Sequence, residues 1–207
     1  MRAFIVGVAA AALIAGAAQA NDIPLWNTGV DATGTAYSSN GNAELHYLVN
    51  GGQAVTYQHP AWTTATDGYW ISTSADGTFT QNPNTYTLTF DLTGFDLSTA
   101  SISGLFAMDD EGSVSLNGGA AITDGGSYHS LSSFNFNSGF VAGVNTLTFT
   151  VIDTGGAPSG LLVSDLHGTA DLAGAVPEPA SWAMMLGGFG MMGGAMRSRR
   201  KAAVSFG

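Results

Sequence analysis

The sequence predicts an all-β protein: a jelly-roll β-sandwich, flanked by an N-terminal signal peptide and a C-terminal single transmembrane helix. Three observations lead to this prediction. Apolar and polar residues alternate in many short segments, the pattern of strands with one buried face. Turn pairs such as Asn-Gly and Asp-Gly separate these segments, and the body shows no sustained helical period. Each end of the chain carries an apolar run of its own.

Residues 1–20 have the features of a secretory signal peptide. Arg2 precedes an apolar run over residues 3–18, and Ala18 and Ala20 form the small-residue pattern that signal peptidase cleaves. We therefore expect passage through the secretion translocon and a mature chain that begins at Asn21. The alternative is an uncleaved membrane anchor, but the short run and its small terminal residues favour cleavage.

The body, residues 21–172, is expected to form the sandwich, followed by a short linker over residues 173–176. The clearest alternation runs over residues 86–92 and 146–151, where apolar residues take turns with threonines. Strands at this spacing favour two packed sheets. Weaker strand patterns occupy residues 45–49, 54–57, 69–72, 101–108, 113–116, 131–136 and 161–166.

The charge of the body is one-sided. Of the 15 Asp and Glu residues only Glu178 lies in the tail, whereas all five Lys and Arg residues lie in the end segments. A body without basic residues cannot neutralise phosphates, so nucleic-acid binding is excluded, and anionic lipid headgroups would repel it. Neutral glycans, cations and basic proteins remain as partners. The chain has no cysteine, which excludes thiol catalysis and cysteine-ligated metals.

The tail, residues 177–201, contains three elements in a fixed order. A Pro-Glu-Pro triplet comes first, an uncharged stretch over residues 180–196 follows, and an arginine-rich cluster comes last. A helix over that stretch would be roughly 25 Å long, close to the roughly 30 Å hydrocarbon core of a bilayer. The sequence therefore predicts a transmembrane helix over residues 180–196, with the basic cluster and residues 202–207 on the cytoplasmic side.

This tail resembles the PEP-CTERM sorting signal in its PEPxxWA form. The residues that match are Pro177, Glu178, Pro179, Trp182, Ala183, Met184, Met185, Arg197, Arg199 and Arg200. The resemblance implies recognition by an exosortase, a membrane transpeptidase-like enzyme that cleaves near Pro-Glu-Pro. These residues would then be a substrate rather than a catalyst. The protein would be anchored transiently in the inner membrane and would end at the cell surface or in the extracellular matrix.

The body carries a series of short markers in order, including residues 26–32, 69–72, 102–110 and 143–149. Over residues 25–172 this order resembles exported PEP-CTERM proteins with a galactose-binding-like jelly roll, a fold shared with many carbohydrate-binding modules. The resemblance implies the fold more firmly than the function, because one sandwich can host many unrelated sites.

Aromatic residues in loops suggest glycan binding. Sugars stack on exposed rings while polar groups bind their hydroxyls. Trp62, in a Thr-rich loop, is the favoured candidate, with Tyr69 and Tyr128 as further ones. The alternative is that these rings belong to the core.

Carboxylates suggest a calcium site, the only cofactor that we consider. Asp109, Asp110 and Glu111 form the densest acidic point of the body, and calcium is bound by such oxygens. The alternative is a polar turn whose side chains bind backbone N–H groups. The galactose-binding-like resemblance adds Asp31, in the loop where some such domains hold calcium. The four histidines show no metal-ligand spacing.

We therefore expect a non-enzymatic exported protein, sorted by an exosortase, associated with exopolysaccharide or biofilm and able to bind glycans. Two alternatives stay open: an exported polysaccharide hydrolase or lyase, and a calcium-stabilised structural adhesin. The sequence has no G-x-S-x-G motif, and its Ser, His and Asp residues are too scattered to name a triad.

Overall fold

The computed structural model describes residues 20–122, 127–174 and 179–200, and within the last range it describes the side chains of residues 184–194. Residues 19–173 form one compact unit, and the C-terminal helix belongs to another. Each is described by itself. Most of the predicted signal peptide (residues 1–19), linker residues 175–176, Pro177, Glu178 and the end of the chain lie outside the described residues.

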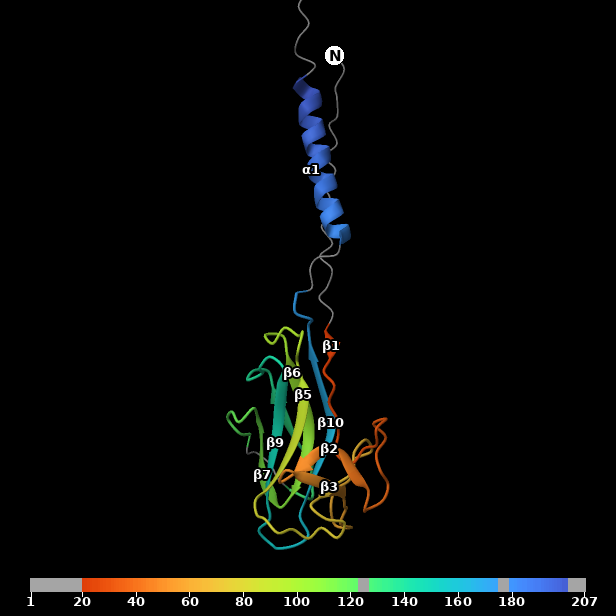
Figure 1. The fold of residues 1–207 in the computed structure, drawn as a ribbon, viewed down its shortest axis with the longest axis vertical. Coiled ribbons are helices and arrows are strands. Elements are labelled where there is room, and N and C mark those ends of the chain that lie inside the picture. Colours follow the sequence, from red (N-terminus) through yellow and green to blue (C-terminus); the bar gives the residue numbers. More distant parts are fainter. Residues whose placement is uncertain (1–19, 123–126, 175–178, 201–207) are drawn as a thin grey trace, which may run out of the picture. The chain divides into compact units, whose positions relative to one another are not determined.

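The body consists of strands, as the alternation predicts (Figure 1). Every segment expected to be a strand contains one, and only the short β1 was not expected. The strands are β1 (Asn21–Asp22), β2 (Ala43–Val49), β3 (Gly52–Thr56), β4 (Ile71–Ser72), β5 (Asn84–Asp91), β6 (Ser101–Asp109), β7 (Glu111–Leu116), β8 (Ser132–Phe136), β9 (Val144–Ile152) and β10 (Gly160–Ala170).

The strands form one nearly closed antiparallel sheet. Their order is β7-β9-β5-β2-β3-β4-β10-β6-β8, and β1 pairs with β10 outside this path. The all-β prediction is confirmed. The expectation of two separate sheets differs from the structure, because the short strands β3 and β4 pair with each other and connect the two halves of the path. The jelly-roll connectivity stays a prediction.

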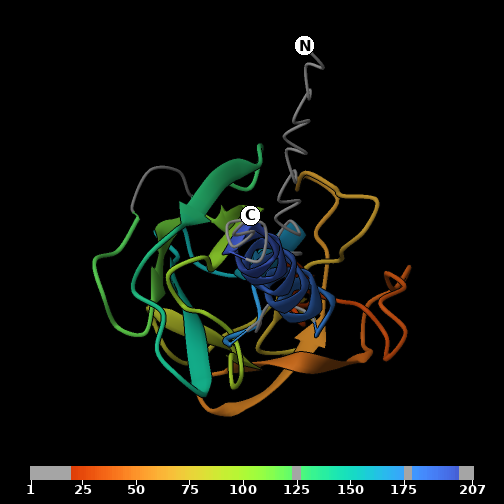
Figure 2. The ribbon, with the colours of Figure 1, turned by 90° about the horizontal axis from the view of Figure 1, so that it is seen from above.

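The core lies where the two ends of this path face each other, with the strands around it (Figure 2). Phe149 of β9 lies 5.7 Å from Phe134 of β8 and 6.4 Å from Phe106 of β6, measured between ring centroids. All three rings are buried. Because β9 lies near one end of the path and β8 at the other, these contacts hold the curved sheet closed.

The registers of β5 and β9 explain which residues enter the core. Tyr86 pairs with Phe149 and Leu88 with Leu147, and all four are buried. Successive residues of a strand point to opposite faces, so the intervening threonines lie on the outer face. The alternation of apolar residues and threonines in the sequence therefore corresponds to the inner and outer faces of these strands.

The helix α1 (Pro179–Arg200) begins at a proline, which is favoured in the first turn because its missing N–H has no helical partner there. The prediction of a helix over residues 180–196 is confirmed. Its predicted membrane span is not supported: in the part of the chain that is described, no helix is long and apolar enough to cross a membrane. The five glycines between residues 187 and 194 lower the mean hydropathy of α1.

Candidate functional site

The outer face of β6 carries a line of side chains that turn away from the core. Phe106 and Met108 are in the core, so Ala107 between them points outward, and Ser103, Leu105 and Asp109 follow the same alternation. Ser103 and Leu105 line a pocket, and Ala107 belongs to a buried cluster around Trp62 and Trp70, here called the tryptophan cluster. The two features therefore share one face of the β unit.

The pocket has a volume of about 460 Å³ and lies over β6, β8 and the middle of β10. Hydroxyl, amide, imidazole and carboxylate groups adjoin apolar side chains in its wall, a combination that suits a hydroxylated ligand with apolar patches. Its lining residues are Ser103, Gly104, Leu105, Ile122, Ser133, Phe134, Asn135, Asp165 and His167.

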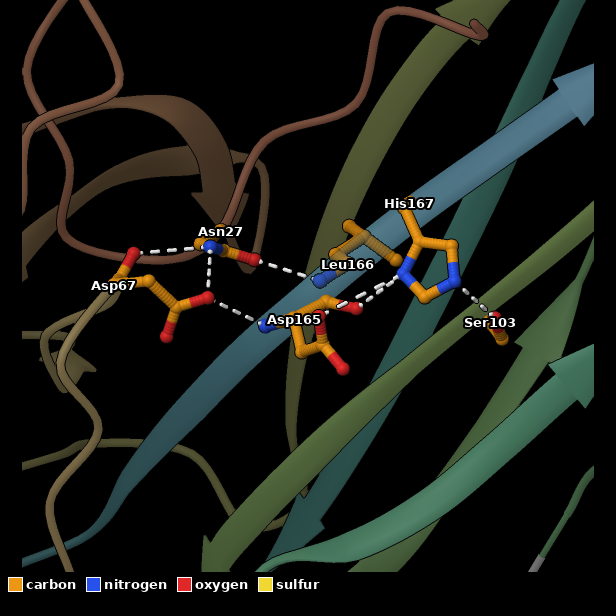
Figure 3. Close-up of polar contacts among 6 residues, drawn as sticks. All are labelled: Asn27, Asp67, Ser103, Asp165, Leu166 and His167. Carbon is orange, nitrogen blue, oxygen red and sulfur yellow. Dashed lines mark hydrogen bonds and ion pairs between the residues drawn. The ribbon is translucent and has the colours of Figure 1, made fainter.

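His167 is held at both ring nitrogens (Figure 3). Its Nδ1 lies 2.8 Å from the Asp165 carbonyl oxygen, and its Nε2 lies 2.9 Å from the Ser103 hydroxyl. A carbonyl can only accept, so in the neutral ring Nδ1 carries the proton and Nε2 accepts the Ser103 O–H. The Asp165 carboxylate lies 3.8 Å from Nδ1, close enough for an ion pair when the ring is protonated.

A β-bulge in β10 makes this arrangement possible. Ser164 pairs with Leu105 and His167 with Ser103, so Asp165 and Leu166 together oppose Gly104. Asp165 has a φ of 48°, the left-handed conformation that aspartate tolerates better than most residues. The extra residue turns the Asp165 carbonyl toward the ring of His167.

Two side chains outside the sheet hold the bulge in place (Figure 3). The Asp67 carboxylate accepts the Asp165 N–H at 2.8 Å, and the Asn27 amide oxygen accepts the Leu166 N–H at 2.9 Å. The Asn27 amide nitrogen donates to Asp67, which ties the two together. Backbone donors freed by the bulge are thus satisfied.

The tryptophan cluster consists of the buried residues Trp62, Trp70, Ala107 and Leu162, with Tyr57, Ala65, Tyr128 and Leu131 packed against it. Trp62 is only 5% exposed, and its ring lies 4.4 Å from that of Trp70 and 5.5 Å from that of Tyr57. The ring has no free face for a sugar. The alternative that Trp62 is a core residue therefore describes it better than the predicted stacking role.

Trp62 also contacts Asp109, which the sequence predicts as a calcium ligand. Its Nε1–H donates to the Asp109 carboxylate at 2.9 Å. Asp109 is buried, and burial, the hydrogen bond and charge of Asp110 and the charge of Asp153 raise its pKa to about 7. The pKa of Asp110 is lowered, first by its hydrogen bond with Asp109. Of these two carboxyls, Asp109 is therefore the one that is protonated at acidic pH.

The two predicted tyrosines are half-buried. Tyr69 donates its hydroxyl to the Asn40 side chain at 3.0 Å. Tyr128 packs against the tryptophan cluster, and its ring lies tilted against that of His129 with centroids 3.9 Å apart. Tyr128 therefore lies beside the outer face, and a glycan-binding role for either residue stays a prediction.

The predicted calcium ligands do not converge. Asp110 accepts the Thr154 N–H and hydroxyl, and Glu111 is exposed at the start of β7. Asp31 accepts three hydrogen bonds from Thr33 and Thr35, which lower its pKa. Among the described residues no group of three or more His, Asp or Glu side chains could hold a metal ion. The polar-turn alternative fits Asp110 and Asp31.

Sequence reasoning missed the pair of Ser103 and His167. The two residues are 64 positions apart, and no local motif marks either one. Their contact follows from the register of β6 and β10, which the bulge shifts by one residue. Alternation identifies strands but not which strands pair, so the signal was absent from the sequence.

Comparison with protein families identifies the tail. The model of the PEP-CTERM protein-sorting motif matches residues 175–201. The chain carries a PEP-CTERM sorting motif. The PEP-CTERM resemblance of the sequence is thereby confirmed, and the motif marks an exported protein that is sorted by an exosortase through its C-terminus. No curated protein and no solved structure matches the chain.

Only part of the PEP-CTERM motif lies within the described residues. Pro179 begins α1, and the arginines of the basic cluster close the same helix. Met184 and Met185 are 67% and 46% exposed on it. The described part of the chain therefore leaves these apolar side chains of the helix exposed.

Proposed function

We propose that this is a cell-surface or extracellular-matrix protein whose β unit binds neutral polysaccharide after exosortase has processed the tail. The observation that carries the proposal is the PEP-CTERM motif over residues 175–201, because this motif marks an exported protein. Signal peptidase and the translocon would act on residues 1–20 before exosortase acts on the tail. The role is binding and presentation, in an exopolysaccharide or biofilm matrix.

Two properties of the β unit support a neutral glycan as the ligand. The body carries no Lys or Arg, so an anionic polysaccharide would meet only carboxylates. The pocket offers Ser103, Ser133 and Asn135 for sugar hydroxyls and Leu105 for an apolar sugar face. The open position of the pocket over the sheet suits one sugar unit of a long polysaccharide.

The export part is tested by mass spectrometry of the mature protein from cells with and without exosortase. We expect a chain that begins at Asn21 and ends near Pro177 when exosortase is present, and a retained tail when it is absent. Glu178→Gln should leave the tail in place, whereas the matched variant Glu111→Gln, at an exposed carboxylate of the body, should be processed normally. A tail retained in every strain would refute the proposal.

The binding part is tested by retention of the full chain on neutral polysaccharides, with acidic polysaccharides as comparison. We expect Asn135→Ala, within the pocket, to weaken retention and Ser101→Ala, on β6 outside the pocket, to leave it unchanged. Retention on no polysaccharide, or equal retention of both variants, would remove the pocket as the binding site.

A second function, hydrolysis at the same pocket, is favoured by one observation, the 2.9 Å contact between Ser103 and His167.

A further inference from the structure

Three polar residues form a row across the outer face at the pocket. His167 of β10 pairs with Ser103 of β6, and Ser103 pairs with Asn135 of β8. Opposed residues of neighbouring antiparallel strands point to the same face with Cβ atoms about 4.5–5.5 Å apart. All three line the pocket. An imidazole, a hydroxyl and an amide therefore adjoin one another in a line.

The imidazole is held in the form that a general base needs. Its Nδ1–H donates to the Asp165 carbonyl, which leaves the Nε2 lone pair to accept the Ser103 hydroxyl. A nucleophile and its base are recognised by such a contact, with the base oriented by a third group. The Asp165 carboxylate, 3.8 Å from Nδ1, stabilises the positive charge that the ring gains when it takes the proton.

Asn135 supplies the remaining part. It is exposed, and among the described residues its side-chain amide has no hydrogen-bond partner. An amide N–H beside a nucleophilic hydroxyl can donate to the oxygen that becomes negative when a carbonyl is attacked. The arrangement thus contains a base, a nucleophile and an oxyanion donor on three consecutive strands.

We propose that His167, Ser103 and Asn135 form an acyl-transfer site that hydrolyses small O-acyl esters on the bound glycan. Ser103 Oγ attacks the ester carbonyl carbon while its proton moves to His167 Nε2. The ester C–O bond then breaks, and the leaving sugar oxygen takes that proton. A water molecule attacks the acyl-serine by the same route, which releases a carboxylic acid and restores Ser103. One ester and one water give one alcohol and one acid.

The chemistry of the pocket favours an ester over a glycosidic bond. Glycosidic cleavage needs two carboxyl groups that flank the bond, and among the described residues that line the pocket one, Asp165, carries a carboxyl. Leu105 offers apolar surface for a small acyl group. His167 is exposed, so an acyl group carried on a polymer can reach the row. The inference rests on the proposed function, because the glycan presents the ester to the row.

The test uses the full chain with p-nitrophenyl acetate as the substrate and a fluorophosphonate as a covalent probe for an activated serine. We expect hydrolysis above the uncatalysed rate and labelling of Ser103. Ser103→Ala and His167→Gln should each lower the enzymatic rate about 100-fold, the usual scale for loss of general-base catalysis. Asn135→Ala should lower it about 100-fold as well, the scale for loss of an oxyanion donor. The controls are Ser101→Ala, on the same strand and face, and His129→Gln; both should retain the rate.

Equal rates for the wild-type chain and Ser103→Ala, or labelling at any residue other than Ser103, would overturn the inference. Near-ultraviolet circular dichroism of each variant identifies one that has lost its fold, and loss of rate with the fold retained supports the site. Retention on polysaccharide separates this inference from the proposed function. If the wild-type chain is retained on polysaccharide and hydrolyses ester, and Ser103→Ala no longer hydrolyses it, both stand. If the wild-type chain is retained on polysaccharide but does not hydrolyse the ester, the ester chemistry is refuted and the proposed function stands.

Discussion

The buried carboxyl of Asp109 makes the stability of the β unit depend on pH. Its pKa is raised to about 7 by burial and by Asp110 and Asp153, compared with 3.8 for a free aspartate. The folded state therefore prefers protonated Asp109. Its contribution is fully present below pH 3.8 and is lost as the pH rises through 7. Three pKa units correspond to an upper limit of about 4 kcal/mol in the free energy of unfolding.

Asp109→Asn is the variant that isolates this effect. An asparagine can still accept the Trp62 Nε1–H, and it carries no charge at any pH. We expect the free energy of unfolding of the wild-type chain to fall more steeply between pH 5 and pH 8 than that of Asp109→Asn. At pH 8 the variant should be the more stable of the two, by up to about 4 kcal/mol.

Urea unfolding followed by tryptophan fluorescence is a suitable assay, because the buried Trp62 donates to this carboxyl and the buried Trp70 packs against Trp62. Asp96→Asn is the control. Asp96 is an exposed carboxylate whose pKa is lowered by hydrogen bonds from Ser98. Its contribution to stability is therefore lost only as the pH falls below the pKa of a free aspartate, outside the range of the assay. Parallel curves for the wild-type chain and Asp109→Asn from pH 5 to pH 8 would refute the reasoning.

Three further substitutions test other parts of the fold. Gly112→Ala should cost about 3 kcal/mol or prevent folding, because its Cβ would lie 1.9 Å from the Thr150 carbonyl oxygen. Gly155→Ala should change the unfolding midpoint little, because its Cβ would meet only the Asp110 carboxylate, at an ordinary contact distance of 3.7 Å. Glu44→Gln should cost about 2 kcal/mol in urea unfolding, because the buried carboxylate accepts N–H groups from Gly29 and His46 and an amide would turn a donor toward one of them. Asp67→Ala should lower ester hydrolysis and leave polysaccharide retention intact, because it frees the Asp165 N–H and loosens the bulge; unchanged hydrolysis would show that Asp67 does not position His167.

The sequence was sufficient to locate the strands because one face of each is buried. In β5 and β9 the residues that enter the core alternate with threonines, and a period of two is visible without any knowledge of the partners. The tail was equally clear, since its three elements are contiguous. Short β1 was missed, because two residues give no period and its pairing with β10 is visible only in space.

The candidate site could not be predicted for the same reason. Ser103, Asn135 and His167 become neighbours only through the registers of β6 with β8 and β10. The position of Trp62 in a Thr-rich loop predicts an exposed ring, but in the structure the ring is buried against Trp70 and Ala107 of β6. The polar residues that flank Trp62 in the sequence thus gave no sign that its side chain is buried.

The pairing of β1 with β10 joins the beginning of the β unit to its end. Asn21 lies opposite Ala170, and the N–H of Thr28 donates to the carbonyl of Val163. Contacts this distant along a chain form late, because a long loop must close before they can. A polypeptide threaded through a pore with its N-terminus first would therefore emerge almost completely before its first strand found a partner, and that strand would stay open to chaperones and proteases for the whole of the passage.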